Sequence, residues 1–442
     1  MLESGPVDIG IIKSDDVINP AEDLAIESVL KDYVVLLGKG GGIFDDRRCE
    51  VMSKSDFSTG VGDVVSKEFF NHKERRVISR RNLVFDPTST ELKPGYINLF
   101  RGFPVVPKKG GCKRWLVLLL MLCENNNEVL VWVLRWLAYP LQNPGAKMRT
   151  AIVIHGGEGT GKNLILSVLL KIYGSYSAII TQTDLESSFN GWASGKLFIN
   201  GNEVVSRQEM YHKKGVIKNM ITEPEWNINE KNINPRKEAN HANFVFTSNF
   251  LQPISPDKDD RRYLVLWTPP KLEKSFYREV AKEISDGGIA AVYDYLLKLD
   301  LGDFDEFTEP LMTKAKGDLI EISMKSDERF ITYWLEGDID LLTTVCRTQE
   351  LYQAYVRWCK TNGEKFHVSQ TEFGNQLGKH EELEKIKHQR YLEGLKEKKG
   401  TFVIPGGMLP PEGQSRAAWL TECNDKFKRS FEAWCDESRE AA

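Results

Sequence analysis

The sequence predicts an α/β fold, and three observations within one stretch of the chain carry that prediction. Residues 151–154 form a short apolar run that is typical of a buried strand. A glycine-rich segment, Gly156–Asn163, follows directly, and apolar residues then recur at helical spacing from Leu164 to Tyr173. Strand, glycine-rich turn and helix in this order form the context that a phosphate-binding loop requires. We therefore expect an α/β core organised around this loop.

The chemistry of this loop fits the phosphates of a nucleotide. Its glycines let backbone N–H groups turn onto phosphate oxygens without a Cβ in the way, and the helix N-terminus adds partial positive charge. Lys162 supplies a point charge for the β- and γ-phosphates. A glycine-rich turn with a chance lysine is the alternative, which the flanking strand and helix disfavour. The expected ATP-binding residues are Gly156, Gly157, Glu158, Gly159, Thr160, Gly161, Lys162 and Asn163.

The last position of the loop departs from the usual P-loop pattern. Asn163 stands where a Ser or Thr hydroxyl would bind Mg²⁺. An amide oxygen also ligates Mg²⁺. We therefore interpret the loop as a variant P-loop that still uses ATP and Mg²⁺.

Length and composition set the remaining limits. The chain has 442 residues, enough for two to four domains, and its 41% apolar and 28% charged residues are typical of a soluble globular protein. The net charge of −4 gives no overall bias toward nucleic acid, so any basic surface must be local. Seven cysteines without a C-x-x-C pair favour reduced thiols and a cytoplasmic location. The longest apolar run, Trp115–Cys123, is too short to span a bilayer, and we expect no membrane partner.

The patterns along the chain predict six segments. Tyr33–Leu37 and Ile43-Phe44, separated by glycines, predict a hairpin, while Arg114–Cys123 and Val129–Tyr139 predict two helices that lead into the loop strand. The expected segments are an α-rich N-terminal α+β region (1–112), a helical lead-in (113–147), a P-loop core (148–271), a helical region (272–345), a winged-helix-like module (346–405), and a linker with a final helix (406–442).

A second short strand, Lys196–Ile199, runs into Asn202-Glu203. An apolar strand that ends in an acidic pair is the Walker B pattern, in which the first acid helps to hold Mg²⁺ and the second polarises the attacking water. Here only the second acid is present, and Glu203 is the candidate general base, with a surface glutamate as the alternative. The expected metal residues are Asn163, Asn202 and Glu203.

Two further strands carry polar residues at their ends. Phe244–Ser248 ends at Asn249, and Arg261-Arg262 precede the strand Leu264–Trp267. An arginine at the edge of the core could reach the γ-phosphate of a neighbouring subunit as an arginine finger. A structural Asp–Arg surface pair is the alternative.

Between these motifs lies Val216–Asn243, whose halves predict a hairpin around Asn232–Pro235. Lys231, Arg236 and Lys237 flank the turn. Cations at a hairpin tip can pair with successive phosphates of single-stranded DNA without reading its sequence. A plain solvated hairpin is the alternative.

In this order, the motifs resemble those of superfamily 3 helicases, and more closely those of the helicase region of phage and plasmid primase-helicases and phage primase-polymerases. The similarity covers roughly residues 30–380 and includes Trp136–Tyr139, Gln142–Gly145 and Glu350–Trp358. The resemblance implies an AAA+-like ring, expected to be hexameric, that moves on DNA with ATP, and it gives Asn249 the role of a sensor for the γ-phosphate or the attacking water. It also implies the cytoplasm of a bacterial host.

The sequence thus favours an ATP-dependent replicative DNA helicase or translocase that acts on single-stranded or forked DNA. Asn163 and Asn202 leave an alternative function possible. In it, the chain is an ATP-binding ring-assembly or loader module with weak or no hydrolysis that tethers a primase to DNA. A metabolic P-loop kinase explains neither the basic hairpin nor the paired arginines. The sequence shows no primase carboxylates, so we expect a primase or polymerase domain upstream or in trans.

Overall fold

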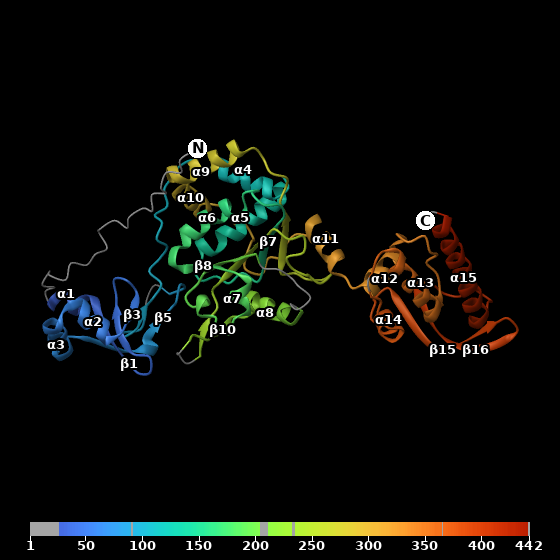
Figure 1. Cartoon of the computed structure of the whole chain (residues 1–442), viewed down its shortest axis with the longest axis horizontal. Helices are drawn as coiled ribbons and strands as arrows, with labels where there is room; N and C mark the ends of the chain where they lie inside the picture. Colours follow the sequence, from blue (N-terminus) through green and yellow to red (C-terminus); the bar gives the residue numbers. More distant parts are fainter. Residues whose placement is uncertain (1–25, 90–91, 204–210, 232–234, 365, 441–442) are drawn as a thin grey trace, which may run out of the picture. The chain divides into compact units, whose positions relative to one another are not determined.

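The structure is a computed structural model that describes residues 26–89, 92–203, 211–231, 235–364 and 366–440 (Figure 1). The chain forms two compact units, which we describe separately. Unit 1 comprises Met1–Ile254 and Arg261–Ala315, and unit 2 comprises Ser255–Asp260 and Lys316–Ala442.

The centre of unit 1 is a five-stranded sheet in the order β13-β7-β12-β9-β8, in which every neighbouring pair is parallel. Its middle strands are buried along almost their whole length, as in sheets that are covered on both faces. The predicted α/β class and the four predicted strands are confirmed. The strands are β7 (Ala151–His155), β8 (Ser177–Ile180), β9 (Phe198–Asn202), β12 (Asn243–Ser248) and β13 (Tyr263–Trp267).

Five helices pack with this sheet into one hydrophobic core, which includes the fully buried Trp115 and Trp136. In Figure 1 these helices gather above β7. The predicted lead-in helices are confirmed as the first two of the five. The last two are separated by a π turn, Ile284–Gly288, where Gly287 has φ 96°. The helices are α4 (Lys113–Leu122), α5 (Asn127–Gln142), α6 (Lys162–Tyr173), α9 (Lys274–Glu283) and α10 (Ile289–Leu297).

The N-terminal part of unit 1 is mixed rather than α-rich, which corrects one expectation. A four-stranded sheet, β3-β2-β1-β4, contains the predicted hairpin, and short helices pack on it through a few buried residues such as Phe57 and Phe69. These strands are too short for the alternating pattern to be clear in the sequence. The elements are α1 (Ile26–Asp32), β1 (Tyr33–Leu37), β2 (Gly42–Asp45), β3 (Glu50–Met52), α2 (Lys54–Val61), α3 (Asp63–Asn71), β4 (Arg76–Ser79), β5 (Leu83–Val84) and β6 (Ile97–Asn98).

Unit 2 contains helices around a three-stranded antiparallel sheet in the order β14-β16-β15. Trp334, Tyr355 and Phe373 are fully buried in its core. The segment 346–405, for which the sequence predicts a winged-helix-like module, contains two helices and a pair of long antiparallel strands. The elements are α12 (Ser326–Glu336), β14 (Cys346–Arg347), α13 (Thr348–Thr361), α14 (Gln370–Leu377), β15 (Leu383–Glu393), β16 (Lys396–Pro405) and α15 (Arg416–Glu440). The helix α11 (Lys314–Ser323) begins at the boundary of the units, so the expected helical region 272–345 is shared between them.

Among the described helices, none is by itself long and apolar enough to cross a membrane. The pair α4 and α5 meets that criterion only jointly, with a bend of 116° between the two helices.

A half-buried lysine, Lys147, fixes the helix that precedes the predicted hairpin. Helix α8 (Tyr211–Thr222) ends with carbonyl groups that have no partner within the helix. The Nζ of Lys147 donates to the carbonyl oxygen of Met220 at 3.0 Å and to that of Ala242, and Arg149 donates to the carbonyl oxygen of Thr222. Burial lowers the pKa of Lys147 well below its ordinary value. This clamp ties the end of α8 to the entry of the central sheet.

We expect Lys147→Met to destabilise unit 1, because it leaves two carbonyl oxygens without a donor. An unsatisfied buried acceptor costs about 1–3 kcal/mol. Urea unfolding followed by tryptophan fluorescence measures the change, and the exposed Lys171→Met on α6 is the control. An unchanged midpoint for Lys147→Met would show that the clamp contributes nothing to stability.

Candidate functional site

The ends of three adjacent strands meet at one edge of the central sheet. The parallel register pairs Ser248 with His155 and Thr247 with Asn202. The P-loop therefore begins where β7 ends, beside Glu203 after β9 and Asn249 after β12. Ligands of open parallel sheets bind beyond this carboxyl edge. The fold thus brings together three motifs that are up to about a hundred residues apart in the chain.

The P-loop has the backbone conformation that its glycines predict. Gly156, Gly159 and Gly161 have φ values of 131°, 71° and 94°, which L side chains rarely adopt. A Cβ on Gly156 would lie 2.3 Å from Thr268 Oγ1. Helix α6 begins at Lys162, so its N-terminal N–H groups point into the loop. The backbone alone is therefore shaped for an anion.

Lys162 is held inside this loop by the loop's own carbonyl groups. Its Nζ donates to the carbonyl oxygens of Gly156 at 2.9 Å and Gly157 at 2.8 Å. Burial lowers the pKa of Lys162, while the carboxylates of Glu203 and Glu158 oppose that lowering. The ammonium group thus lies where phosphate oxygens could replace the two carbonyls as its acceptors.

The candidate base and the candidate sensor are in direct contact. The Asn249 Nδ2 donates to Glu203 Oε1 at 2.7 Å. Glu203 has φ 54°, uncommon for a residue other than glycine, and its N–H donates to the Thr247 carbonyl oxygen. Strained backbone of this kind is concentrated at functional sites. This hydrogen bond holds the Glu203 carboxylate at the carboxyl ends of the strands, where the P-loop begins.

The donors available to a metal include one carboxylate, Glu203, and two amides. Asn163 is exposed on the first turn of α6, and Asn202 Oδ1 accepts a hydrogen bond from Thr247 Oγ1 at 3.0 Å. Among the described residues, no group of three or more His, Cys, Asp or Glu side chains could hold a metal ion. This donor set fits a Mg²⁺ ion that arrives with the nucleotide, since Mg²⁺ commonly uses one or two carboxylates together with phosphates and water.

Arg261 and Arg262 lie at the amino ends of the parallel strands, opposite the ends at which the P-loop begins. They precede β13, whose register pairs Tyr263 with Ala151 and Trp267 with His155. At about 3.3 Å per residue, the P-loop begins roughly 15 Å further along the strand. Arg261 is 76% exposed and lies 3.8 Å from a Glu309 oxygen. This position places the arginine pair away from the P-loop of the same chain.

The predicted basic hairpin is present, but its cations differ in their surroundings. Strands β10 (Glu225–Ile228) and β11 (Arg236–Ala239) pair in antiparallel fashion, and residues 232–234 of the turn lie outside the described residues. Lys231 is exposed, and the Lys237 side chain is 75% exposed with its Nζ 3.8 Å from Glu225. These two lysines face solvent, as expected for a hairpin tip.

Arg236 departs from that expectation. Its guanidinium donates to Glu230 at 2.8 Å, to Glu238 at 2.7 Å and to Ser194 Oγ at 3.0 Å. Two carboxylates thus neutralise it, and it ties the loop to the rest of unit 1 instead of presenting a free charge. Sequence reasoning missed these partners because none of them belongs to a motif.

Lys271 lies close to the P-loop, although no sequence motif indicates it. A Cβ on Gly159 would lie 3.2 Å from Lys271 Cε and 3.5 Å from its Nζ. Within the described part of the chain, Lys271 forms no ion pair. It follows strand β13 and brings a second ammonium group to the P-loop, through a proximity that only the sheet order creates.

The two adjacent glycines of the loop allow a matched test. Gly156→Ala should deform the P-loop and lower both the thermal midpoint and nucleotide affinity, because φ is 131° and the Cβ would overlap Thr268. Gly157→Ala is the control, since the nearest atom to its Cβ lies 3.8 Å away. Differential scanning fluorimetry with and without ATP reports both effects. Equal behaviour of the two variants would refute the steric argument.

The comparisons with known proteins support a relation to phage DNA replication proteins. A family model described as poxvirus D5 protein-like matches residues 328–404, and a family of unknown function matches residues 154–262. The DNA primase-polymerase of Nitratiruptor phage NrS-1 is 30% identical over 270 residues, which cover 56% of this chain and 37% of that protein. The chain thus matches little more than a third of the length of this relative.

Solved structures of the NrS-1 C-terminal region share the fold. An apo structure has a TM-score of 0.63 at 21% identity and covers 88% of this chain and 100% of its own. A second apo form has a TM-score of 0.62 at 22% identity, with 87% and 100% covered. The predicted resemblance to the phage primase-helicase type is therefore confirmed, and the chain has the fold of the C-terminal region of a phage primase-polymerase.

Proposed function

We propose that this chain is an ATP-dependent DNA helicase or translocase module of superfamily 3, with an AAA+-like P-loop core. The observation that carries the proposal is the hydrogen bond between Asn249 and Glu203 at the edge where the P-loop begins. This contact places the Glu203 carboxylate at the end of the sheet where the P-loop begins. A carboxylate held beside a phosphate-binding loop is what hydrolysis requires.

In the proposed reaction the loop N–H groups and Lys162 bind the β- and γ-phosphates. Bound Mg²⁺ would supply charge neutralisation at these phosphates, held by Glu203 and the amides of Asn163 and Asn202. Glu203 accepts a proton from the attacking water, and Asn249 orients that carboxylate and the water. A general base of this kind contributes about 10²–10⁴ in rate.

The position of Arg261 and Arg262 supports a site that is shared between subunits. Their edge of the sheet is remote from their own P-loop, as the strand register implies. In a ring, which the resemblance leads us to expect as a hexamer, one of them would act on the γ-phosphate bound by the neighbouring subunit. The assembly thus belongs to the proposal.

For the DNA, we propose Lys231 and Lys237 as phosphate contacts and Arg236 as a positioning residue for the hairpin. The two lysines are exposed, whereas Arg236 is bound by Glu230 and Glu238. The partner is single-stranded or forked DNA in the cytoplasm of a phage-infected host. Because the NrS-1 relative is named a primase-polymerase, a primase or polymerase domain is the expected further partner.

A second candidate is an ATP-binding loader module with weak hydrolysis that tethers a primase. The amide oxygen of Asn202 already accepts a hydrogen bond from Thr247, and Asn163 is exposed and neutral. Asn202 replaces an acid by a neutral amide, and the loss of that negative charge weakens Mg²⁺ binding. Turnover by the unmodified protein separates the two candidates.

Steady-state ATPase measurements test the catalytic assignment. Glu203→Gln should lower turnover by about 10²–10⁴, because the amide cannot accept the proton. Glu68→Gln, on the exposed face of α3, is the charge-matched control. If Glu203→Gln turns over ATP at the unmodified rate, Glu203 is not the base. An unmodified protein that binds ATP without hydrolysing it would favour the loader.

Salt-dependent binding of a labelled single strand tests the hairpin. Lys231→Ala with Lys237→Ala should reduce the log–log salt slope by about 0.7 for each lost phosphate contact. Lys67→Ala with Lys171→Ala removes the same charge from exposed positions elsewhere in unit 1. A slope that falls equally in both double variants would leave only a general charge effect.

A further inference from the structure

Helix α14 packs firmly in the core of unit 2 and has a row of exposed polar side chains along one side. Phe373 and Leu377 are fully buried and hold the helix in the core, and a capping box closes its first turn. Thr371 and Asn375 are one turn apart on another side, and Lys379 continues the line just beyond the helix. All three are exposed. Hydroxyl, amide and ammonium groups thus face solvent along one line.

The ribbon formed by β15 and β16 packs directly beside this line. Two glycines of the helix permit the close approach. A Cβ on Gly374 would lie 3.3 Å from Lys385 Nζ, and one on Gly378 would lie 3.5 Å from Lys385 Cδ. The Nζ of Lys385 also donates to the carbonyl oxygen of Gly374. Helix and ribbon therefore form one continuous surface within unit 2.

The outer side of the ribbon gathers positive charge. Arg390 and Lys399 are direct cross-strand partners, and like charges in that relation destabilise a sheet. Arg390 has one carboxylate partner, Glu397 at 3.4 Å. Lys387 is exposed at the bulge between Ile386 and Gln389. An anion bound to this side would relieve the repulsion.

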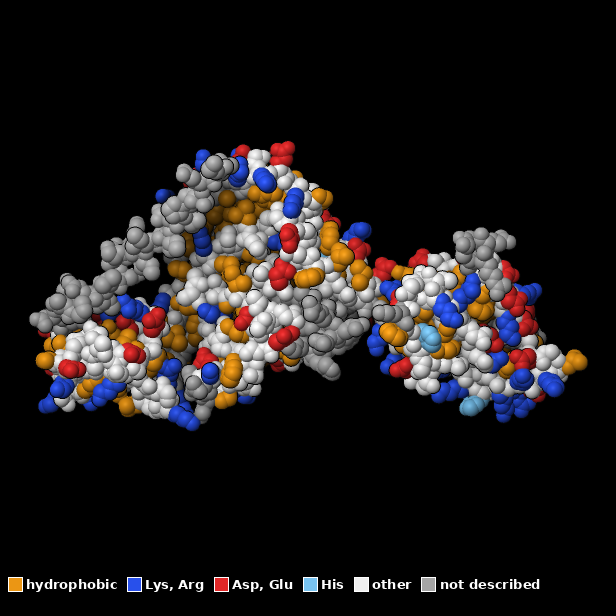
Figure 2. All heavy atoms as spheres, in the orientation of Figure 1, with side chains coloured by type: hydrophobic (Ala, Val, Ile, Leu, Met, Phe, Trp, Pro, Cys, Tyr) orange, Lys and Arg blue, Asp and Glu red, His pale blue; other side chains and the backbone are white. Residues whose placement is uncertain are grey.

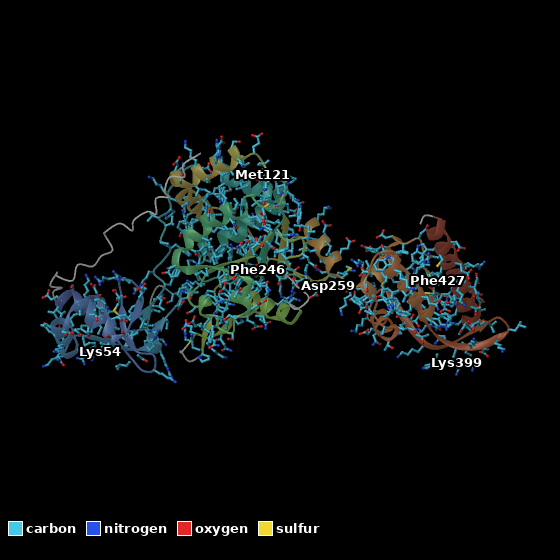
Figure 3. All side chains as sticks on the ribbon, viewed as in Figure 1. Lys54, Met121, Phe246, Asp259, Lys399 and Phe427 are labelled. Atoms are coloured by element: carbon cyan, nitrogen blue, oxygen red, sulfur yellow. The ribbon has the colours of Figure 1, made fainter. Side chains whose placement is uncertain are left out.

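Three cations of this surface have no carboxylate partner within the described residues, namely Lys379, Lys387 and Lys399. Figure 2 shows lysine and arginine side chains gathered along the lower edge of unit 2, where Figure 3 labels Lys399. The chain as a whole has a net charge of −4, so this concentration is local. Ion pairing inside the protein does not account for it.

The other side of the ribbon is closed. Tyr391 is buried there, and the Leu392 N–H donates to Thr421 Oγ1 of helix α15 at 2.9 Å. Lys428 of the same helix lies 3.9 Å from Glu393. Helix α15 thus covers this side, which leaves the face next to α14 as the open one.

We propose that the surface formed by α14 and the outer side of the β15–β16 ribbon binds duplex DNA. A helix with Thr371 and Asn375 on its exposed line fits the major groove, where hydroxyls and amides bond base edges. The ribbon cations Lys387, Arg390 and Lys399 contact phosphates beside the groove. These residues include no aromatic ring for base stacking, which a single strand would use. The proposal is independent of nucleotide binding in unit 1.

Fluorescence anisotropy of the full-length chain with a short labelled duplex, without nucleotide, tests this surface. Lys387→Gln with Lys399→Gln should reduce the log–log salt slope by about 1.8, since each lost duplex phosphate contact removes about 0.9. Lys426→Gln with Arg429→Gln removes the same charge from helix α15, on the closed side, and should leave the slope unchanged. ATP affinity should stay the same in both variants.

Four outcomes would overturn the proposal. An unchanged slope for Lys387→Gln with Lys399→Gln would exclude phosphate contacts by these lysines. An equal fall in the α15 control would show general charge attraction. A single strand of the same length that loses as much slope as the duplex would remove the preference for duplex. If no duplex binds while an acidic protein partner does, the surface is a protein interface.

Discussion

The parallel register of strands β7, β12 and β9 is the constraint on which the site depends. Strand β12 lies between the other two, so the residue after it, Asn249, can meet the residue after β9, Glu203. All six residues of β12 are buried, and a slip of one residue would turn its buried side chains to the other face. The apolar packing of β12 therefore fixes the relative positions of Glu203 and Asn249 at the ends of the strands.

The same dependence on distant packing holds for the hairpin. One end is fixed where Lys147 and Arg149 satisfy the last carbonyls of α8, and the other where Arg236 bonds Glu230 and Glu238. Lys231 and Lys237, which remain exposed, lie close to these fixed points. Rigid support lowers the entropy that a flexible loop loses when it binds a ligand.

Much of the core was predictable because its signals are local. The glycine-rich loop, the apolar strands and the helical periodicities each lie within a few consecutive residues, and the structure confirms them. The α-rich N-terminal region was wrong, since the short, half-buried strands of that region carry little periodic signal. The partners of Arg236 and the approach of Lys271 to Gly159 could not be predicted, because both depend on which segments the sheet brings together.

The way in which Lys162 is held has a consequence for ligand selection. Its ammonium already has two acceptors, the carbonyl oxygens of Gly156 and Gly157. A ligand that draws it away must replace both, because a buried donor left without an acceptor is costly. A phosphate group carries several oxygens that can replace them, whereas a nucleoside without phosphate offers the loop no anionic acceptor. The contacts of Lys162 with the loop carbonyls would therefore favour phosphorylated ligands over ligands without a phosphate group.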